Sequence, residues 1–390
     1  MKLDALEAPL LAQGFDGDDL ADESIFSAAQ LDIIIPQLAG EEKEATNVQK
    51  RRFLKKIVKL RVSGVPAQLC APPPLAPLPG EIDTTRLAID RADLIGSGGF
   101  GTVYGAVLDG APVAVKLVKP EQSPYGPLAM RKMLVEEVEI MKKACDSTSS
   151  GVCELFGTVA LRTGELGLVM KRYTRSLQDE IDRCASTGGM RMKRVLYIAT
   201  HVARAAAELH AVNPPILLRD LKPDNILIDH HAHPVIADFG CAGQAGMSSM
   251  VEQTRGGTGF SFTGRVVGTT RYMAPEQIGW MYPKEWKYSG FARVSSHADV
   301  WAFACTVGAM LIRGPLWGEA DERMIGGSLK TWKVDFDAEE FKAAIDLPLT
   351  CPLPLKGIVE QCLVVPPYDR PSFTELATQL GRIVLPVERG

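Results

Sequence analysis

The 390-residue sequence contains no pair of cysteines at the spacing of a zinc or dithiol motif. Its eight cysteines are scattered, at positions 70, 145, 153, 184, 241, 305, 351 and 362. No run approaches the roughly 18 apolar residues that a membrane-spanning helix needs. Near the start, Asp4 and Glu7 occupy positions where a secretory signal needs basic residues before an apolar run. These absences predict reduced thiols and a cytoplasmic location, with the nucleus as the alternative.

The sequence also lacks an excess of positive charge. Its formal net charge is −4, which gives no bulk attraction to nucleic acid, so we expect no nucleic-acid partner. Hydrophobic residues make up 46% of the chain, enough to bury a core. Because single cores stop growing at roughly 250 to 300 residues, the length predicts two or three compact units.

The first 62 residues form an acidic and then a basic segment that we expect to be helical and regulatory. Residues 49–61 place apolar side chains on one helical arc and most bases on the other. Such a helix can contact a membrane surface or a protein partner, serve as a nuclear import signal, or pack on its own domain. Residues 63–85 are rich in proline, which predicts a semi-rigid linker.

Beyond the linker, short strands surround a glycine-rich stretch. Residues 96–101 have the pattern G-x-G-x-x-G, which is a weak signal alone. No helix is indicated after it, because residues 102–107 are β-rich and lead to the hairpin signal Asp109-Gly110. The return strand, residues 113–118, carries Lys116 as its single charge. A glycine hairpin can lie over phosphates, and Lys116 would reach the same oxygens.

The next segments indicate two lobes. Residues 128–144 have helical periodicity and carry three glutamates, one of which we expect to orient Lys116. Two strands, at 155–161 and 166–170, lead into a polar connector at 171–174. Long helices follow at 191–210 and from 297 to about 311, the second with Asp299 as a polar anchor.

Asp220 lies in a polar segment between two apolar runs, residues 216–218 and 226–228. Asn225 belongs to the same segment, and a second carboxylate follows in Asp238-Phe239-Gly240. Two carboxylates and a carboxamide suit Mg²⁺ with a phosphate ligand, because this ion takes only one or two carboxylates from a protein. Residues 238–276 have no periodicity, which is typical of a functional loop.

In this order, the segments resemble the eukaryotic protein kinases across residues 86–386. The resemblance rests on the glycine loop, Ala114-Val115-Lys116, residues 219–225, Asp238-Phe239-Gly240, Ala274-Pro275-Glu276 and Asp299-Val300-Trp301. Glu81-Ile82-Asp83 and residues 370–373 look most like the tyrosine-kinase-like branch. The resemblance implies an α+β bilobal fold, with a small β-rich N-lobe (86–170) that holds one helix, a hinge (171–174) and a larger, mainly helical C-lobe (175–386).

The resemblance also implies ATP and Mg²⁺ as cofactors and a role for each matching residue. Lys116 would pair with the α- and β-phosphates and be held by Glu137. Asp238 and Asn225 would each ligate a Mg²⁺ ion, Asp220 would accept the proton of the substrate hydroxyl, and Lys222 would stabilise the γ-phosphoryl group. The implied ATP-binding residues are Ile95, Gly96, Ser97, Gly98, Gly99, Phe100, Gly101, Thr102, Val103, Ala114, Lys116, Glu137, Met170 and Arg172.

Lys222 and residues 268–273 resemble serine/threonine kinases, which implies a protein substrate with a serine or threonine hydroxyl. Arg219 implies that a phosphate added to the 238–276 loop by an upstream kinase orders that loop. The candidate acceptors are Ser248, Ser249, Thr254, Thr258, Ser261 and Thr263.

The sequence departs from the family at Leu218, where a histidine usually precedes the Arg-Asp pair. A leucine supports the turn only by packing, so we expect reduced activity although no reacting group is lost. The alternative to an active kinase is a catalytically weak pseudokinase that acts as a signalling scaffold.

Overall fold

A computed structural model describes most of the second compact unit of the chain, Leu78–Gly390. The residues it describes are 77–98, 101–118, 126–148, 151–186, 188–244, 272–274, 276–277, 295–312, 347–364 and 366–385. The predicted acidic and basic segment and the linker up to residue 76 lie outside this set, as does the loop from 245 to 271.

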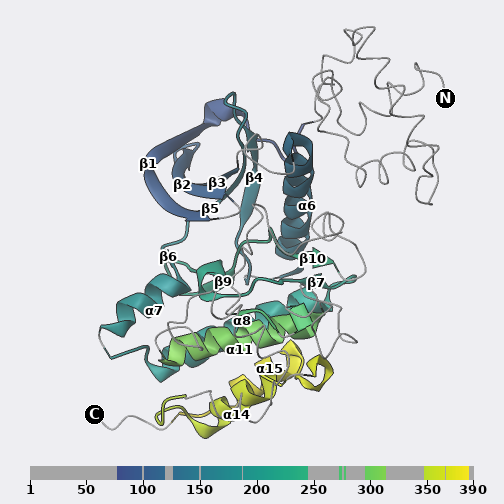
Figure 1. Cartoon of the computed structure of the whole chain (residues 1–390). Helices are drawn as coiled ribbons and strands as arrows, with labels where there is room; N and C mark the ends of the chain where they lie inside the picture. Colours follow the sequence, from purple (N-terminus) through teal and green to yellow (C-terminus); the bar gives the residue numbers. More distant parts are fainter. Residues whose placement is uncertain are drawn as a thin grey trace, which may run out of the picture. The chain divides into compact units, whose positions relative to one another are not determined.

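The first half of this unit is a five-stranded antiparallel sheet with one helix (Figure 1). Its strands, in spatial order, are β1 (Leu87–Gly98), β2 (Gly101–Leu108), β3 (Ala111–Val118), β5 (Leu166–Lys171) and β4 (Leu155–Ala160). The helix is α6 (Gly126–Ser147), and a 3₁₀ turn, η2 (Thr84–Arg86), precedes β1. Asp109 and Gly110 have φ of 49° and 86°, the left-handed values that a tight hairpin turn requires.

The two faces of the sheet have separate cores because strand side chains alternate between faces. Val113, Val115 and Leu117 of β3 belong to one hydrophobic cluster with Val159 and Val169. On the other face, the apolar residues share a cluster with α6: Leu78, Val118, Leu134, Val138, Leu166 and Leu168. Because Lys116 alternates with Val115 and Leu117, its side chain lies on the α6 face.

The second half of the unit is mainly helical (Figure 1). Its helices are α7 (Leu177–Ala185), α8 (Met192–Ala211), α11 (Ser296–Ile312), α14 (Leu353–Cys362) and α15 (Phe373–Gly381), with the 3₁₀ turn η7 (Pro367–Asp369). Every residue from Ala298 to Leu311 in α11 is buried, so this helix forms the centre of the lobe. Among the residues that the structure describes, no helix is both long and apolar enough to cross a membrane.

Short strands carry the polar segments around Asp220 and Asp238 on the side of the helical lobe that faces the five-stranded sheet (Figure 1). One small sheet has the order β6 (Arg175–Ser176), β8 (Ile226–Ile228) and β9 (Pro234–Ile236), and the other pairs β10 (Gly243–Gln244) with β7 (Ile216–Leu217). The 3₁₀ turn η4 (Pro223–Asn225) lies between β7 and β8. The predicted α+β architecture, a sheet with one helix followed by a mainly helical lobe, is therefore confirmed.

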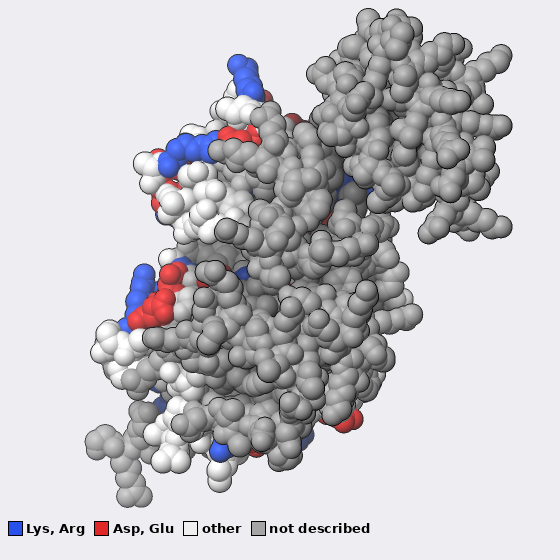
Figure 2. All heavy atoms as spheres, in the orientation of Figure 1, with Lys and Arg blue, Asp and Glu red and all other residues white. Residues whose placement is uncertain are grey.

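Charges of both signs are mixed on the face shown in Figure 2. Described basic and acidic atoms lie close together over the sheet and over α7 in this view. On α7, Asp179, Asp182 and Arg183 are exposed. This mixture agrees with the small net charge of the sequence, −4.

A buried ion pair and a partly buried cluster around Glu180 connect elements of the helical lobe. Arg370 donates to both carboxylate oxygens of Glu276, at 2.7 and 2.9 Å, and these side chains are 0% and 2% exposed. Nearer the sheet, Glu180 of α7 accepts from Arg194 of α8 at 2.6 and 3.0 Å and from Arg175 of β6 at 2.9 Å. The Glu180 interactions fix α7 and α8 beside β6, the strand that follows the connector from the sheet.

We predict that Glu180→Gln removes a pH-dependent contribution to stability. Burial alone raises the pKa of Glu180, but Arg194 and Arg175 outweigh it and hold that pKa below 4.5. The stabilisation is therefore complete above pH 4.5 and is lost as the pH falls through the folded-state pKa. At pH 7 the variant should lose about 2 kcal/mol in urea unfolding, and the difference from the wild type should shrink in acid. Glu208→Gln, at an exposed position of α8, is the control; a pH-independent loss in Glu180→Gln would contradict the prediction.

Candidate active site

Lys116 of β3 is buried between two carboxylates from distant parts of the chain. Its Nζ lies 2.8 Å from Oε1 of Glu137 on α6 and 2.7 Å from Oδ1 of Asp238, which follows β9. The Lys116 side chain is 9% exposed, Glu137 11% and Asp238 28%. The lysine therefore joins the sheet, its helix and the helical lobe at one point.

Burial and charge act in opposite directions on these groups. Burial alone lowers the pKa of Lys116, but the negative charges of Asp238 and Glu137 outweigh it and raise that pKa above its usual value. Burial raises the pKa of Asp238, but the Lys116 charge outweighs it and holds the carboxyl pKa below its usual range. For Glu137, burial prevails over the Lys116 charge and raises the pKa. Lys116 and Asp238 are thus kept in their charged forms.

A second group of polar side chains surrounds Asp220. Lys222 Nζ lies 2.7 Å from Asp220 Oδ2, and Asn225 Nδ2 donates to the same oxygen at 3.0 Å and to the Asp220 carbonyl at 2.8 Å. Burial raises the pKa of Asp220 against the opposing charge of Lys222. For Lys222, the Asp220 charge outweighs burial and raises the pKa. The backbone joins both groups, because Ala237 N donates to Asn225 O at 2.8 Å just before Asp238.

Asp299 of α11 stabilises the turn that carries Asp220. Asp299 is 1% exposed. Its carboxylate accepts from the backbone N–H of Leu218 at 2.8 Å and of Arg219 at 2.7 Å, and it lies 2.9 Å from Nε2 of His210 on α8. Arg219 has a φ of 64°, an unfavourable value for a side chain of its size. The paired amides stabilise this conformation, which turns the chain away from β7 toward Asp220.

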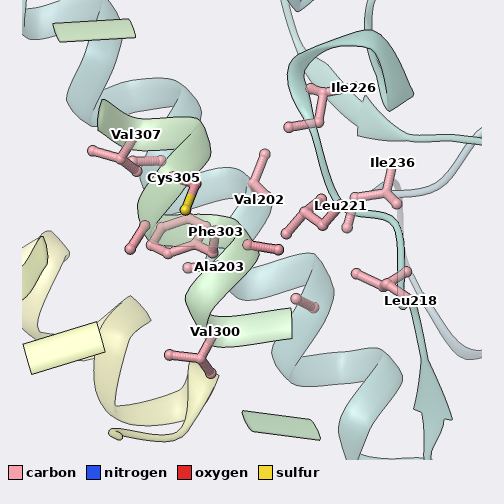
Figure 3. Close-up of a cluster of buried hydrophobic side chains, with 14 of the residues drawn as sticks. Val202, Ala203, Leu218, Leu221, Ile226, Ile236, Val300, Phe303, Cys305 and Val307 are labelled. Carbon is pink, nitrogen blue, oxygen red and sulfur yellow. The ribbon is translucent and has the colours of Figure 1, made fainter. Parts of the chain in front are cut away.

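Leu218 is 5% exposed and belongs to the largest hydrophobic cluster of the described chain. Figure 3 shows it near Ile236, on the side of α8 and α11 where Leu221 and Val202 lie. Phe239, which is 1% exposed, is part of the same cluster. Leucine thus supports the turn by packing, as expected from the sequence, and its backbone has a second support in Asp299.

The predicted glycine loop spans the end of β1 and the start of β2. Gly98 and Gly101 face each other across the two strands, and the tip, Gly99 and Phe100, lies outside the described residues. A Cβ at Gly101 would lie 2.4 Å from the carbonyl oxygen of Leu117, and its φ is 129°. Only glycine fits there, because β2 passes close over the strand that carries Lys116.

The other predicted nucleotide-binding residues divide into two groups. Ala114 and Met170 are register partners on β3 and β5, on the same face as Lys116. Arg172 instead directs its side chain to Asp93 of β1, with which it forms an ion pair. A Cβ at Gly105 would lie only 2.4 Å from Nη1 of Arg172, so this pair crosses β2 where there is no side chain.

Sequence reasoning did not identify His210 and Gln277 as parts of this site. Gln277 accepts from Ala274 N at 2.8 Å and donates to the carbonyl of Arg219 at 3.3 Å, which ties the Ala-Pro-Glu segment to the turn. His210 contacts Asp299 across 89 residues of sequence. The position of Gln277 directly after the Ala-Pro-Glu motif was the available signal, whereas nothing in the sequence around His210 pointed to Asp299. The predicted loop phosphorylation sites lie outside the described residues.

We predict that Asp299→Asn weakens the turn before Asp220. The amide replaces one acceptor oxygen with a donor, so one of the two backbone N–H groups loses its partner, at a cost of about 1–3 kcal/mol. Hydrogen exchange at residues 217–220 should accelerate. Thr306→Val is the matched control on α11, since the Thr306 hydroxyl donates to the carbonyl of Ala302 at 2.9 Å in that same helix. Equal exchange in both variants would mean that Asp299 does not support the turn.

Comparison with known proteins adds a match to the protein kinase domain family over residues 89–380. The chain is 30% identical over 336 residues to mitogen-activated protein kinase kinase kinase 10 of Mus musculus, which covers 82% of this chain and 31% of that protein. It is 26% identical over 330 residues to serine/threonine-protein kinase CTR1 of Arabidopsis thaliana, covering 82% and 36%.

A third relative is E3 ubiquitin-protein ligase KEG of Arabidopsis thaliana, 29% identical over 271 residues, covering 66% of this chain and 16% of that protein. The chain therefore spans well under two thirds of the length of each of these relatives. The family match covers the sheet, α6 and the polar groups around Lys116 and Asp220. With this match and this arrangement of residues, the chain belongs to the protein kinase family.

Proposed function

We propose that this protein is a serine/threonine protein kinase that transfers the γ-phosphoryl group of ATP to a protein hydroxyl. The observation that carries the proposal is the position of Lys116, bonded to Glu137 at 2.8 Å and to Asp238 at 2.7 Å. A lysine fixed in this way offers a permanent positive charge at the edge of the glycine loop. This charge would hold the α- and β-phosphates of the nucleotide.

Asp238 and Asn225 are suited to hold Mg²⁺. Asn225 uses its Nδ2 as a donor to Asp220, so the carbonyl oxygen is the atom it can offer to a cation. One carboxylate and one carboxamide are enough for Mg²⁺, because this ion takes most of its ligands from phosphate and water. When bound, Mg²⁺ neutralises charge on the transferring phosphate.

Asp220 and Lys222 are placed to act on the other reactant. The hydroxyl oxygen of a serine or threonine bonds to the γ-phosphorus while the bond to the β,γ-bridging oxygen breaks, which leaves ADP. Asp220 orients that hydroxyl and accepts its proton, a role that its raised pKa favours. Lys222, 2.7 Å from the Asp220 carboxylate, stabilises the negative charge of the phosphoryl group. Each stabiliser of this kind contributes on the order of 10²–10³ in rate.

Lys222 and the names of the relatives support serine and threonine as acceptors. Two relatives from Arabidopsis thaliana are named as serine/threonine-protein kinases, one of them as probable. We further propose membership of the tyrosine-kinase-like branch and activation through a phosphate that pairs with Arg219. The pseudokinase alternative is less well supported, because Lys116, Asp220, Asn225 and Asp238 are arranged together and the turn at Leu218 is held by Asp299.

The proposal predicts ³²P transfer from ATP to the protein itself or to a generic basic protein when Mg²⁺ is present. Asp220→Asn keeps the shape of the side chain but removes the proton acceptor, so incorporation should fall by on the order of 10²–10³. Removal of Mg²⁺ with a chelator should abolish transfer, and its return should restore it. Glu208→Gln serves as the control variant.

Two results would contradict the proposal. Equal incorporation by the wild type and Asp220→Asn would assign the activity to another residue or to a contaminant. No incorporation, even after treatment with an upstream kinase that phosphorylates the 238–276 loop, would favour the pseudokinase.

A further inference from the structure

Residues 78–82 lie before the start of the protein kinase match at residue 89, yet they extend the sheet. Ile82 N donates to the carbonyl of Thr158 on β4 at 2.8 Å, and Thr158 N donates to the carbonyl of Gly80 at 3.1 Å. The Thr158 hydroxyl donates to the carbonyl of Pro79 at 3.2 Å. Strand β4 is the last strand of the sheet order, so the segment pairs with its outer edge. The composition had assigned these residues to the proline-rich linker.

Two glycines allow this close approach. A Cβ at Gly157 of β4 would lie 2.4 Å from the carbonyl oxygen of Gly80 and 2.9 Å from Cγ1 of Ile82. Gly80 itself has a φ of 70°, a value that side chains disfavour. A side chain at position 157 would push the segment away from the strand, whereas a side chain at position 80 would strain the backbone. Glycine at position 80 of the segment and at position 157 of β4 therefore permits the two backbones to pair.

The segment places its two apolar side chains in different clusters. Leu78 is 3% exposed and shares a cluster with Leu134 and Val138 of α6. Ile82 packs instead against the cluster of β3 and β4 residues on the opposite face. Leu78 is held in place by its own turn, since its N–H donates to Oε2 of Glu81 at 2.8 Å. Of these two side chains, Leu78 is therefore the one that joins the apolar cluster between α6 and the sheet.

The contact lies beside the site, because Glu137 is the neighbour of Val138 on α6. Helix α6 runs along β4 (Figure 1), and its buried stripe fixes both its rotation and its distance from the sheet. A shift of α6 away from β3 would lengthen the 2.8 Å bond between Glu137 and Lys116. Loss of an apolar contact on this stripe would therefore weaken the bond from Glu137 that positions the Lys116 ammonium group.

We propose that residues 78–82 form a clamp that holds α6 where Glu137 bonds to Lys116, with Leu78 as a positioning residue for phosphoryl transfer. The catalytic part of the proposal rests on the proposed kinase activity. The clamp itself is a property of the fold and has its own test. Residues 78–82 precede the family match, which starts at residue 89, so in this proposal a five-residue segment before the matched domain supports the active site through Leu78.

The test compares Leu78→Ala with Ile82→Ala in the full chain. Both variants shorten an apolar side chain of the same five-residue segment, but only the first lies on the α6 face. Hydrogen exchange across 130–141 should accelerate in Leu78→Ala and remain at the wild-type rate in Ile82→Ala. This readout needs no enzymatic activity, so it decides on the clamp even if the wild type transfers no phosphate. Equal protection of α6 in both variants, or equal loss, would overturn the clamp.

The catalytic role is tested by a double-mutant cycle with Glu137→Gln. Leu78→Ala alone should lower kcat by about tenfold, Leu78→Met should restore most of it, and Ile82→Ala should change it by less than twofold. If Leu78 acts through Glu137, its replacement should have no further effect on kcat in the Glu137→Gln background. Independent, multiplicative losses in the double variant would assign Leu78 a general structural role and overturn this part of the proposal.

Discussion

The structure depends on one buried positive charge, the ammonium group of Lys116. An unpaired charge at a buried position is too costly to keep, and breaking a buried pair by removing one partner typically costs about 3–5 kcal/mol. Lys116 is paired twice, at 2.8 Å with Glu137 and at 2.7 Å with Asp238. These partners lie on a helix and on the segment after β9, so pairing the lysine requires the sheet, α6 and the helical lobe to meet. The electrostatic requirement of one side chain thus assembles the site where we propose that ATP binds.

On the catalytic side of the site, a fixed backbone carries reacting groups that are themselves largely buried, with side-chain exposures of 9% for Asp220 and 15% for Lys222. Asp299, within a helix buried on all sides, accepts two backbone N–H groups and holds Arg219 in its left-handed conformation. Leu218 fills the hydrophobic cluster on the same turn. The side chain of Asp220 then needs only Lys222 and Asn225 to fix its direction. At the position where the family usually has a histidine, the turn is thus supported by leucine packing and by the backbone bonds to Asp299.

Local patterns were sufficient to predict the parts of the fold that depend on periodicity and motif. Lys116 stood out as the single charge in the apolar strand 113–118, and the apolar patterns at 191–210 and from 297 to about 311 predicted α8 and α11 close to their observed bounds. The polar segment around Asp220 was evident because two apolar runs enclose it. By contrast, Leu78 lies in a proline-rich stretch, and its burial depends on the edge of β4, about 80 residues away. The contact of His210 with Asp299 is equally non-local. Neither leaves a signal in the nearby sequence, since both arise only from tertiary packing.

The measurement that tests the central claim most directly is kcat for Lys116→Met beside that for Lys132→Met, an exposed lysine on α6. Methionine keeps most of the volume of the buried side chain while it removes the charge. The account predicts that kcat falls by on the order of 10²–10³ in Lys116→Met and stays at the wild-type value in Lys132→Met. A folded Lys116→Met variant with wild-type kcat would contradict the account, because phosphoryl transfer would then not depend on the charge around which the site is built.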